Sequence, residues 1–544
     1  MILLYAATAA CLSALASATI VGLDHCLLTK VSPASTVVLP LSPGYLNATT
    51  STNLSWEYYA AAIVFVATPE DAAAAIKCAA AHKVPVTPRG GRHSYASFGS
   101  GGRNGALVVD VTALRNVTYD ANTGYATVGA GLRLGDLALA LDAYGRATPH
   151  GTCPLVGIGG HATCGGFGDA SRQWGLLTDQ IVGVTAVSAT GDILHVDESH
   201  HPDLLWAIRG AAPSFATVLS FTIKTYPQPT VTTYYIIEFG NFSNSPDIAA
   251  QALSAYQSFA ATSAPPELGI RFRFSRQPTL PLDVMLNGVY YGSQEDFTAA
   301  IQPLLDSLPF QPVSQTISTQ SYIESVVLLA VGDPLNSTDH YDTPNTAYLK
   351  SILVPTQSPL SDDTWSKFVD FAFNTEIPDG IIYYFWEIDI FGGSFNGKPT
   401  AIPSLSPDVN AFGGRDGLIL MQQYVLPLSE DPLHLLMSSL SSGTYAGGDP
   451  GKYPAGGRTF ANNFAGAIIN NVHAEGKEVK AYACYVEYAS VVGAKDFITD
   501  AATSPLLSAD QAHALYYGPD HTRRLKDLKR KWDPARVFDF PHAF

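Results

Sequence analysis

Two glycine-rich stretches hold the residue types best suited to binding and reactive chemistry. The first covers residues 87–95, Thr-Pro-Arg-Gly-Gly-Arg-His-Ser-Tyr, and follows a short apolar run at residues 84–86 that predicts a strand. Adjacent glycines let backbone N–H groups converge on an anion, because no Cβ blocks its approach. The spacing is neither a Walker loop nor a GxGxxG that opens a helix. Taken alone, the loop fits either a phosphate site or an ordinary turn.

The second stretch covers residues 151–168 and contains seven glycines together with Cys153 and His161. Glycine loses more backbone freedom on folding than any other residue, so this density of glycines is costly. Apolar residues lie between the glycines, which argues against a merely flexible loop. We therefore expect a ligand to lie against this backbone.

The elements around these stretches predict an α+β unit that runs to about Tyr226. The apolar run at residues 61–66 is typical of a buried strand. Thr68 and Pro69 then supply an N-cap and a first-turn proline for an Ala-rich helix that ends at His82. Further expected elements are strands at 106–111 and 126–128 and a helix at 134–144.

Beyond Pro227 the pattern changes to aromatic, partly alternating segments that predict a second domain built on a large, mostly antiparallel sheet. The expected strands are residues 234–239, 271–274, 284–291, 381–390 and 418–426, with helices near 248–261 and 364–374. A basic segment at residues 521–531 is more typical of a solvated helix face than of a nucleic-acid site.

Composition excludes several classes of protein. The chain has 544 residues, of which 47% are hydrophobic, so it can bury real cores and is not disordered. It carries 31 Lys+Arg against 47 Asp+Glu, a formal charge of −16, which argues against binding to nucleic-acid phosphates. No stretch is apolar for long enough to span a membrane.

The N-terminus indicates export. Residues 1–18 are apolar and end in Ala16-Ser17-Ala18, the small-x-small pattern of a signal peptidase site, so we expect a secreted, extracellular protein. Of six cysteines, Cys11 would leave with this peptide, and the remaining odd number leaves at least one unpaired or modified. Glycosylation sequons, which suit a secreted glycoprotein, begin at Asn47, Asn53, Asn116, Asn241 and Asn336.

The two glycine-rich stretches together closely resemble the bicovalently flavinylated oxidases of the vanillyl-alcohol-oxidase superfamily, in its berberine-bridge-enzyme-like group. In that group a His of the first loop and a Cys of the second loop both bond to the isoalloxazine of FAD. The matching residues here are His93 and Cys153. Supporting matches are Ser171-Arg172-Gln173-Trp174-Gly175-Leu176, residues 203–210, Tyr516-Tyr517-Gly518 and Trp532-Asp533-Pro534. The resemblance covers about Tyr58 to Phe540, nearly the whole mature chain.

The resemblance implies a two-domain α+β flavoenzyme, with a PCMH-type FAD-binding domain and a substrate domain whose seven-stranded antiparallel sheet faces the flavin. The expected parts are a signal peptide at 1–18, an N-terminal lead-in at 19–55, the FAD-binding domain at 56–229, the substrate-binding domain at 230–490 and a C-terminal berberine-bridge-like segment at 491–544 that packs on the FAD domain. The implied FAD contacts are His93, Cys153, Arg89, Gly90, Gly91, Arg92, Ser94, Val156, Gly157, Gly159, Gly160, His161, Gly166 and Tyr517. No metal is implied.

Within the group the chain is most similar to the gluco-, chito- and xylo-oligosaccharide oxidases. This similarity implies oxidation of the reducing-end C1 hydroxyl of a mono- or oligosaccharide to a lactone, with O2 reduced to H2O2. The residue that matches the family's catalytic base is Tyr485. A phenol with a pKa near about 10 costs roughly 4 kcal/mol to ionise at pH 7, so it needs assistance. In the carbohydrate oxidases an Asp assists the base, and the residue that matches it here is Asp389.

Strand alternation puts Phe385, Glu387 and Asp389 on one face of the strand at 381–390, which we expect to point at the flavin. The sugar contacts that the resemblance implies are Tyr95, Glu387, Gln423 and Tyr482. Glu387 replaces the amide usual in gluco-oligosaccharide oxidases, and Cys484 stands where relatives often have Asn.

The resemblance also implies a disulfide between Cys26 and Cys78, with Cys164 and Cys484 left free. Val156, three residues after the flavin-linked Cys, matches a position that controls access of oxygen to the flavin. Relatives with Val there tend to be oxidases, and those with Ile or Leu tend to be dehydrogenases. We expect a monomer whose partners are a carbohydrate and O2.

Two alternatives stay open. The first keeps the cofactor but changes the substrate, giving an alkaloid- or terpenoid-type oxidase that forms rings or double bonds. The second is a non-catalytic secreted flavoprotein. A peroxide assay across a panel of sugars separates the carbohydrate oxidase from the first alternative, and bleaching of the flavin by any substrate would exclude the second.

Overall fold

The structure is a computed structural model that describes residue 20 and residues 22–241, 245–280, 282–337, 346–427, 453–480 and 509–544. The expected signal peptide and the residues Tyr482, Cys484 and Tyr485 lie outside this part of the chain. Within the described part, no helix is long and apolar enough to cross a membrane.

The described strands are β1 Thr36–Val38, β2 Ala62–Phe65, β3 Val86–Arg89, β4 Leu107–Asp110, β5 Val117–Asp120, β6 Tyr125–Gly129, β7 Arg146–Ala147, β8 Ile181–Val187, β9 Ile193–Asp197, β10 Thr217–Lys224, β11 Tyr226–Pro227, β12 Thr232–Asn241, β13 Leu268–Arg276, β14 Asp283–Tyr290, β15 Ser314–Gln320, β16 Tyr348–Pro355, β17 Ile381–Ile390, β18 Ser394–Phe395, β19 Lys398–Pro399 and β20 Gly417–Pro427.

The described helices are α2 Leu23–Lys30, α3 Tyr45–Thr49, α4 Pro69–Ala81, α5 Leu134–Asp142, α6 Ile158–Thr163, α7 Ser171–Trp174, α8 Leu177–Gln180, α9 Pro202–Ala211, α10 Pro246–Thr262, α11 Gln294–Ser307, α12 Tyr322–Leu329, α13 Asp362–Asn374, α14 Ala401–Ser404, α16 Ala455–Ala474, α17 Ala509–Tyr517 and α18 Pro519–Trp532, with 3-10 turns η1 Phe98–Ser100, η2 Ala212–Ser214 and η3 Pro407–Val409.

The first glycine-rich loop leaves the end of a four-stranded sheet of order β1-β2-β4-β3, in which β2, β4 and β3 run parallel. Strand β3 begins at Val86, later than the predicted strand at 84–86, and runs on to Arg89. Its Pro88 is tolerated because β3 lies at the edge of the sheet, where one row of backbone groups needs no partner strand. The loop therefore starts directly at the carboxyl end of a strand.

The N-terminal lead-in has more regular structure than its sequence predicts. It contains α2 and α3, and β1 pairs antiparallel with β2. Helix α2 packs on α4, and the disulfide between Cys26 and Cys78 joins these two helices, as the family resemblance implies. Local sequence did not reveal these elements, because the disulfide and tertiary packing hold them.

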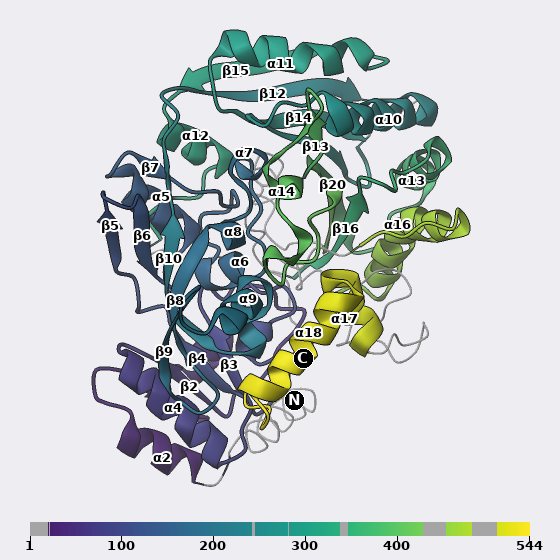
Figure 1. The fold of residues 1–544 in the computed structure, drawn as a ribbon. Helices are drawn as coiled ribbons and strands as arrows, with labels where there is room; N and C mark the ends of the chain where they lie inside the picture. The colour runs from purple at the N-terminus through teal and green to yellow at the C-terminus, as the bar shows by residue number, and fades with distance from the viewer. Residues whose placement is uncertain are drawn as a thin grey trace.

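A second sheet completes the N-terminal domain. It has five antiparallel strands in the order β5-β6-β10-β8-β9. The C-terminal segment lies against this domain: the backbone N–H of Val86 donates to the carbonyl of Val537 at 2.7 Å. Lys529 donates from Nζ to the carbonyls of Ser214 and Phe538, both at 2.6 Å. Figure 1 shows α18 in yellow beside α9.

The second domain is built on a seven-stranded sheet in the order β15-β12-β14-β13-β17-β20-β16, with every neighbouring pair antiparallel. This confirms the two-domain α+β fold and the strand number that the resemblance implies. Helices α10, α13 and α16 lie along one side of the sheet (Figure 1). The aromatic contacts of Trp386 with Phe368 and Phe464, at 5.1 and 5.3 Å, tie the sheet to these helices.

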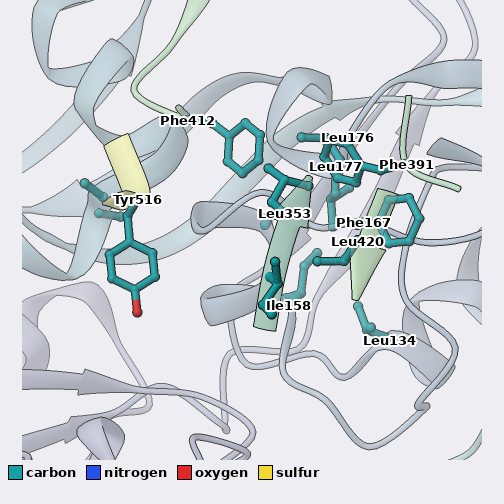
Figure 2. Close-up of a cluster of buried hydrophobic side chains, with 14 of the residues drawn as sticks. Leu134, Ile158, Phe167, Leu176, Leu177, Leu353, Phe391, Phe412, Leu420 and Tyr516 are labelled. Atoms are coloured by element: carbon teal, nitrogen blue, oxygen red, sulfur yellow. The ribbon is translucent and has the colours of Figure 1, made fainter. Parts of the chain in front are cut away.

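The hydrophobic core continues from one domain into the other. Phe391 of the second domain packs on Phe167, with ring centroids 5.1 Å apart, and Phe412 packs in turn on Phe391. Figure 2 shows these rings together with Leu176 and Leu177 of the N-terminal domain. The two domains are thus joined through a packed apolar interface beside the second glycine-rich stretch.

Candidate active site

Cys153 and His93 come from different loops and lie side by side. The Sγ of Cys153 is 3.7 Å from Nε2 of the His93 ring. Both residues line one large pocket, which runs between the two glycine-rich stretches and the inner face of the seven-stranded sheet. A thiol and an imidazole at this distance can both reach a single planar group placed over them.

The two glycine-rich loops cross in direct contact. A Cβ on Gly91 would lie 2.4 Å from the backbone N of Gly157, and one on Gly157 would lie 2.3 Å from the backbone N of Gly91. Neither position accepts a side chain, because real Cβ atoms do not approach backbone atoms this closely. Gly160 differs: a Cβ there would meet nothing within 4 Å, and the residue lines the pocket. The crossing loops therefore form a cradle of backbone groups that is open on the pocket side.

Arg89 lies next to the cradle and lines the same pocket. Its Nε donates to Asp110 at 2.7 Å and its Nη1 donates to the carbonyl of Ala48 at 2.8 Å. Burial lowers the pKa of Arg89 to about 10, against the favourable effect of Asp110, so the guanidinium stays charged at neutral pH. Its Nη2 is buried without a hydrogen-bond partner among the described residues. A buried cation beside an open glycine cradle fits an anionic cofactor such as FAD.

His161 fixes the backbone just before Cys153. Its Nε2 accepts a hydrogen bond from the N–H of Gly151 at 3.0 Å. Burial, with a smaller effect from nearby His150, lowers the pKa of His161 to about 3. The imidazole is therefore neutral, and its proton sits on Nδ1, because Nε2 is the acceptor.

Most of the expected FAD contacts line this pocket. They are Arg89, Gly90, Gly91, Arg92, His93, Ser94, Cys153, Val156, Gly157, Gly159, Gly160, His161 and Tyr517. Gly166, the remaining expected contact, is not among the residues that line the pocket. Its φ is +76°, and a Cβ there would lie 2.5 Å from the Cβ of Leu177. That glycine serves a tight turn packed on Leu177.

The sheet contributes a polar face to the same pocket. Glu387 lines the pocket, together with Arg271, Gln422 and Tyr424, which the sequence did not single out. Asp389 lies just beneath, with 2% of its surface exposed. Its two carboxylate oxygens accept hydrogen bonds from Nε of Arg271 at 2.9 Å and from Nε2 of Gln422 at 2.7 Å. Burial raises the pKa of Asp389 to about 6, although Arg271 acts to lower it.

The expectation that Gln423 contacts the sugar is wrong, because Gln423 lies on the opposite face of the sheet from the pocket. Gln423 pairs with Trp386, so its side chain shares the helix-covered face of the sheet, and it is fully buried. Gln422 pairs with Glu387 and therefore points with it into the pocket. Directly opposed residues of an antiparallel pair project to the same side, which makes Gln422 the amide available to a substrate.

Aromatic side chains close the pocket near His93. The ring of Tyr95 stands perpendicular to that of His93, with centroids 5.6 Å apart, and both Tyr95 and Tyr424 line the pocket. Tyr424 stacks on Phe385 at 4.2 Å. Tyr482 and Tyr485, expected at this site, lie outside the described residues.

Comparisons with known proteins agree with this geometry. Residues 60–197 match the FAD binding domain model, and residues 485–543 match the model for berberine and berberine-like proteins. The chain is 31% identical to a carbohydrate oxidase of Microdochium nivale, covering 96% of this chain and 94% of that protein. It is 32% identical to a xylooligosaccharide oxidase of Thermothelomyces thermophilus, covering 89% of this chain and 87% of that protein.

Solved structures show the same likeness. The crystal structure of the carbohydrate oxidase from Microdochium nivale in complex with a substrate analogue has a TM-score of 0.79 at 30% identity, covering 96% of this chain and 98% of that one. The xylooligosaccharide oxidase from Myceliophthora thermophila in complex with xylobiose has a TM-score of 0.79 at 29% identity, with the same coverage. Fold and site together define an FAD-linked oxidoreductase. The chain belongs to the berberine-bridge-like family of FAD-dependent oxidases, in the group that contains these carbohydrate oxidases.

Proposed function

We propose that the protein is a secreted oxidase that converts the reducing-end C1 hydroxyl of mono- or oligosaccharides to a lactone and reduces O2 to H2O2. The single observation that carries the proposal is the meeting, in one pocket, of the Cys153–His93 pair with a polar sheet face bearing Glu387, Arg271 and Gln422. The first pair suits a covalently held flavin. The second set suits the hydroxyls of a sugar.

The proposed cofactor is FAD bonded through both His93 and Cys153. The 3.7 Å separation of Sγ and Nε2 supports attachment to neighbouring positions of one ring. A solved glucooligosaccharide oxidase of Acremonium strictum, 28% identical with a TM-score of 0.79, is described as carrying a 6-S-cysteinyl, 8α-N1-histidyl FAD. When bound, FAD would accept the hydride that leaves the sugar carbon.

The chain must remove the hydroxyl proton. We assign that role to Tyr485, with assistance from Asp389. Two hydrogen bonds, from Arg271 and Gln422, fix the carboxylate of Asp389 at the edge of the pocket. A buried carboxylate lowers the cost of taking a proton from a neighbouring phenol, because its own charge is poorly solvated.

The sugar itself would lie between the sheet and the aromatic residues. Tyr95 and Tyr424 offer rings for the apolar faces of a pyranose, and we assign Tyr482 a further contact. Glu387 is oriented to accept hydrogen bonds from hydroxyl groups, while Arg271 and Gln422 can donate them.

Export is supported by the apolar N-terminus and by the disulfide between Cys26 and Cys78, since disulfides persist in oxidising compartments. Asn47 and Asn116 are exposed, so their sequons can carry glycans. Asn53 cannot: its Nδ2 is buried and donates to the carbonyls of Tyr95 at 2.7 Å and Ala347 at 3.1 Å.

A peroxide assay across glucose and cello-, xylo- and chito-oligomers tests the proposal. We expect H2O2 with at least one of these sugars, and loss of that activity in Tyr485→Phe with the flavin still attached. The relatives also include an FAD-linked oxidoreductase of Metarhizium anisopliae, 30% identical over 92% of this chain, which is not named as a carbohydrate oxidase. If none of the sugars yields H2O2, the proposal is refuted and a secondary-metabolite substrate is favoured.

A further inference from the structure

The largely buried guanidinium of Arg271 interacts electrostatically with three carboxyl groups beside the pocket. The Nε of Arg271 donates to Asp389 at 2.9 Å, and its Nη1 lies 3.7 Å from Oε1 of Glu387. Asp169 is the third carboxyl group whose charge acts on both Arg271 and Asp389. All four side chains are largely or fully buried, so solvent screens their interactions only weakly.

Separate elements bring these groups together. Arg271 lies on β13 directly opposite Asp389 on β17, in the register of the antiparallel pair. Glu387 lies two residues before Asp389 on the same face, and Asp169 comes from the loop between α6 and α7. A Cβ on Gly269 would lie 2.8 Å from Oδ1 of Asp169, so β13 passes directly against this loop.

We propose that Arg271 is a positioning residue that keeps Asp389 ionised and correctly oriented, so that this carboxylate can assist proton removal from the substrate. The inference rests on the proposed function, in which Asp389 assists the base. Arg271 contributes through its charge and through one of the two hydrogen bonds that hold the carboxylate. Gln422 makes the second bond but carries no charge.

The balance of charges explains why a cation is needed. Burial, together with the charges of Glu387 and Asp169, raises the pKa of Asp389 to about 6 against the lowering effect of Arg271. Burial also raises the pKa of Asp169, whose Oδ2 has no hydrogen-bond partner among the described residues. Loss of an opposite charge at this distance shifts a carboxyl pKa upward by about one to three units. Without Arg271, about half or more of Asp389 would therefore be protonated at neutral pH.

The first test is the pH dependence of flavin reduction by a sugar, measured without oxygen. In Arg271→Gln we expect the acidic limb of the pH–rate profile to move up by about one to three pH units, so that the rate at pH 6 falls about fivefold or more and rises again as the pH approaches 9. Arg271→Lys, which keeps the charge, should restore the limb to near its original position. Asp169→Asn removes a negative neighbour and should move the limb the other way, to lower pH.

Arg273→Gln is the matched control. Arg273 lies two residues further along β13 and is buried, but it donates to the hydroxyl of Tyr383 at 2.8 Å and lies over the ring of Phe385. It is not among the residues that line the pocket. We expect Arg273→Gln to leave the acidic limb of the pH–rate profile in place, even if it changes the unfolding temperature.

Thermal unfolding provides a second readout that needs no sugar. Arg271→Gln should lower the unfolding temperature more at pH 8, where Asp389 is ionised, than at pH 5, where Asp389 is largely protonated. An equal loss of rate at every pH, together with an equal drop in unfolding temperature at both pH values, would overturn the proposal. If no sugar reduces the flavin, the proposed function fails, and the unfolding comparison alone decides whether Arg271 controls the charge of Asp389.

Discussion

The sulfur of Cys153 and Nε2 of His93 lie 3.7 Å apart, although 60 positions separate the two residues in the sequence. The contact exists because Gly91 and Gly157 let their loops cross with backbone against backbone. Neither loop alone creates an attachment site for a planar cofactor. Their crossing places two reactive side chains at one edge of the same pocket.

The first prediction concerns the covalent bonds. If FAD is bonded through both residues as proposed, His93→Ala and Cys153→Ala should each keep the flavin attached through the remaining residue, because the two proposed bonds involve different atoms of the ring. Only the double variant should release FAD on acid denaturation. Mass spectrometry of flavin-bearing peptides checks this, and release of free FAD from the unaltered protein would contradict it.

The second prediction concerns oxygen. Val156 lines the pocket three residues after Cys153, and one added methylene can fill a space the size of O2 in a close-packed wall. Val156→Ile should slow reoxidation by at least about tenfold while leaving reduction by sugar nearly unchanged. Stopped-flow measurement of the two half-reactions separates this outcome from simple packing damage, in which both steps slow alike.

The third prediction compares two neighbouring amides on β20. Gln422→Leu should reduce kcat/KM for the sugar by about tenfold or more, since Gln422 faces the pocket and holds Asp389. Gln423→Leu should leave kinetics unchanged and be neutral or stabilising, because both amide atoms of Gln423 are buried without partners among the described residues. Steady-state kinetics and thermal unfolding of both variants provide the comparison, and equal kinetic loss would disprove the assigned register.

The sequence alone could not assign Gln422 and Gln423 to the two faces of the sheet. The strand at 418–426 is predictable from its apolar character, but β20 is buried along almost its whole length on both faces. Without a polar side, alternation cannot tell which residues face the pocket. In β17, by contrast, the polar residues Glu387 and Asp389 are spaced two apart, and they correctly mark the pocket side.

Other features depend on contacts distant in sequence. Arg271 becomes significant only when β13 pairs with β17 and sets it opposite Asp389. The edge strand β15 is largely polar and partly exposed, so it has little hydrophobic signal. The loop motifs were readable because glycine at a crossing point is a steric requirement that no other residue meets.

The fourth prediction concerns acid stability. His513 and His542 are buried, and burial lowers the pKa of His513 to about 4. An unfolded His binds its proton near pH 6.5, so the folded state loses stability as pH falls from about 6.5 towards 4. His513→Gln should flatten this part of the curve of unfolding temperature against pH. His25→Gln, at an exposed site, serves as the control and should leave the curve unaltered.

Anaerobic mixing of the flavin-loaded protein with the panel of sugars tests the central claim most directly, with absorbance of the flavin and mass of the sugar product followed together. We predict that at least one sugar bleaches the flavin and yields its lactone, and that admission of air restores the colour with release of H2O2. Flavin absorbance that stays unchanged with every sugar would contradict the assignment of this pocket to carbohydrate oxidation.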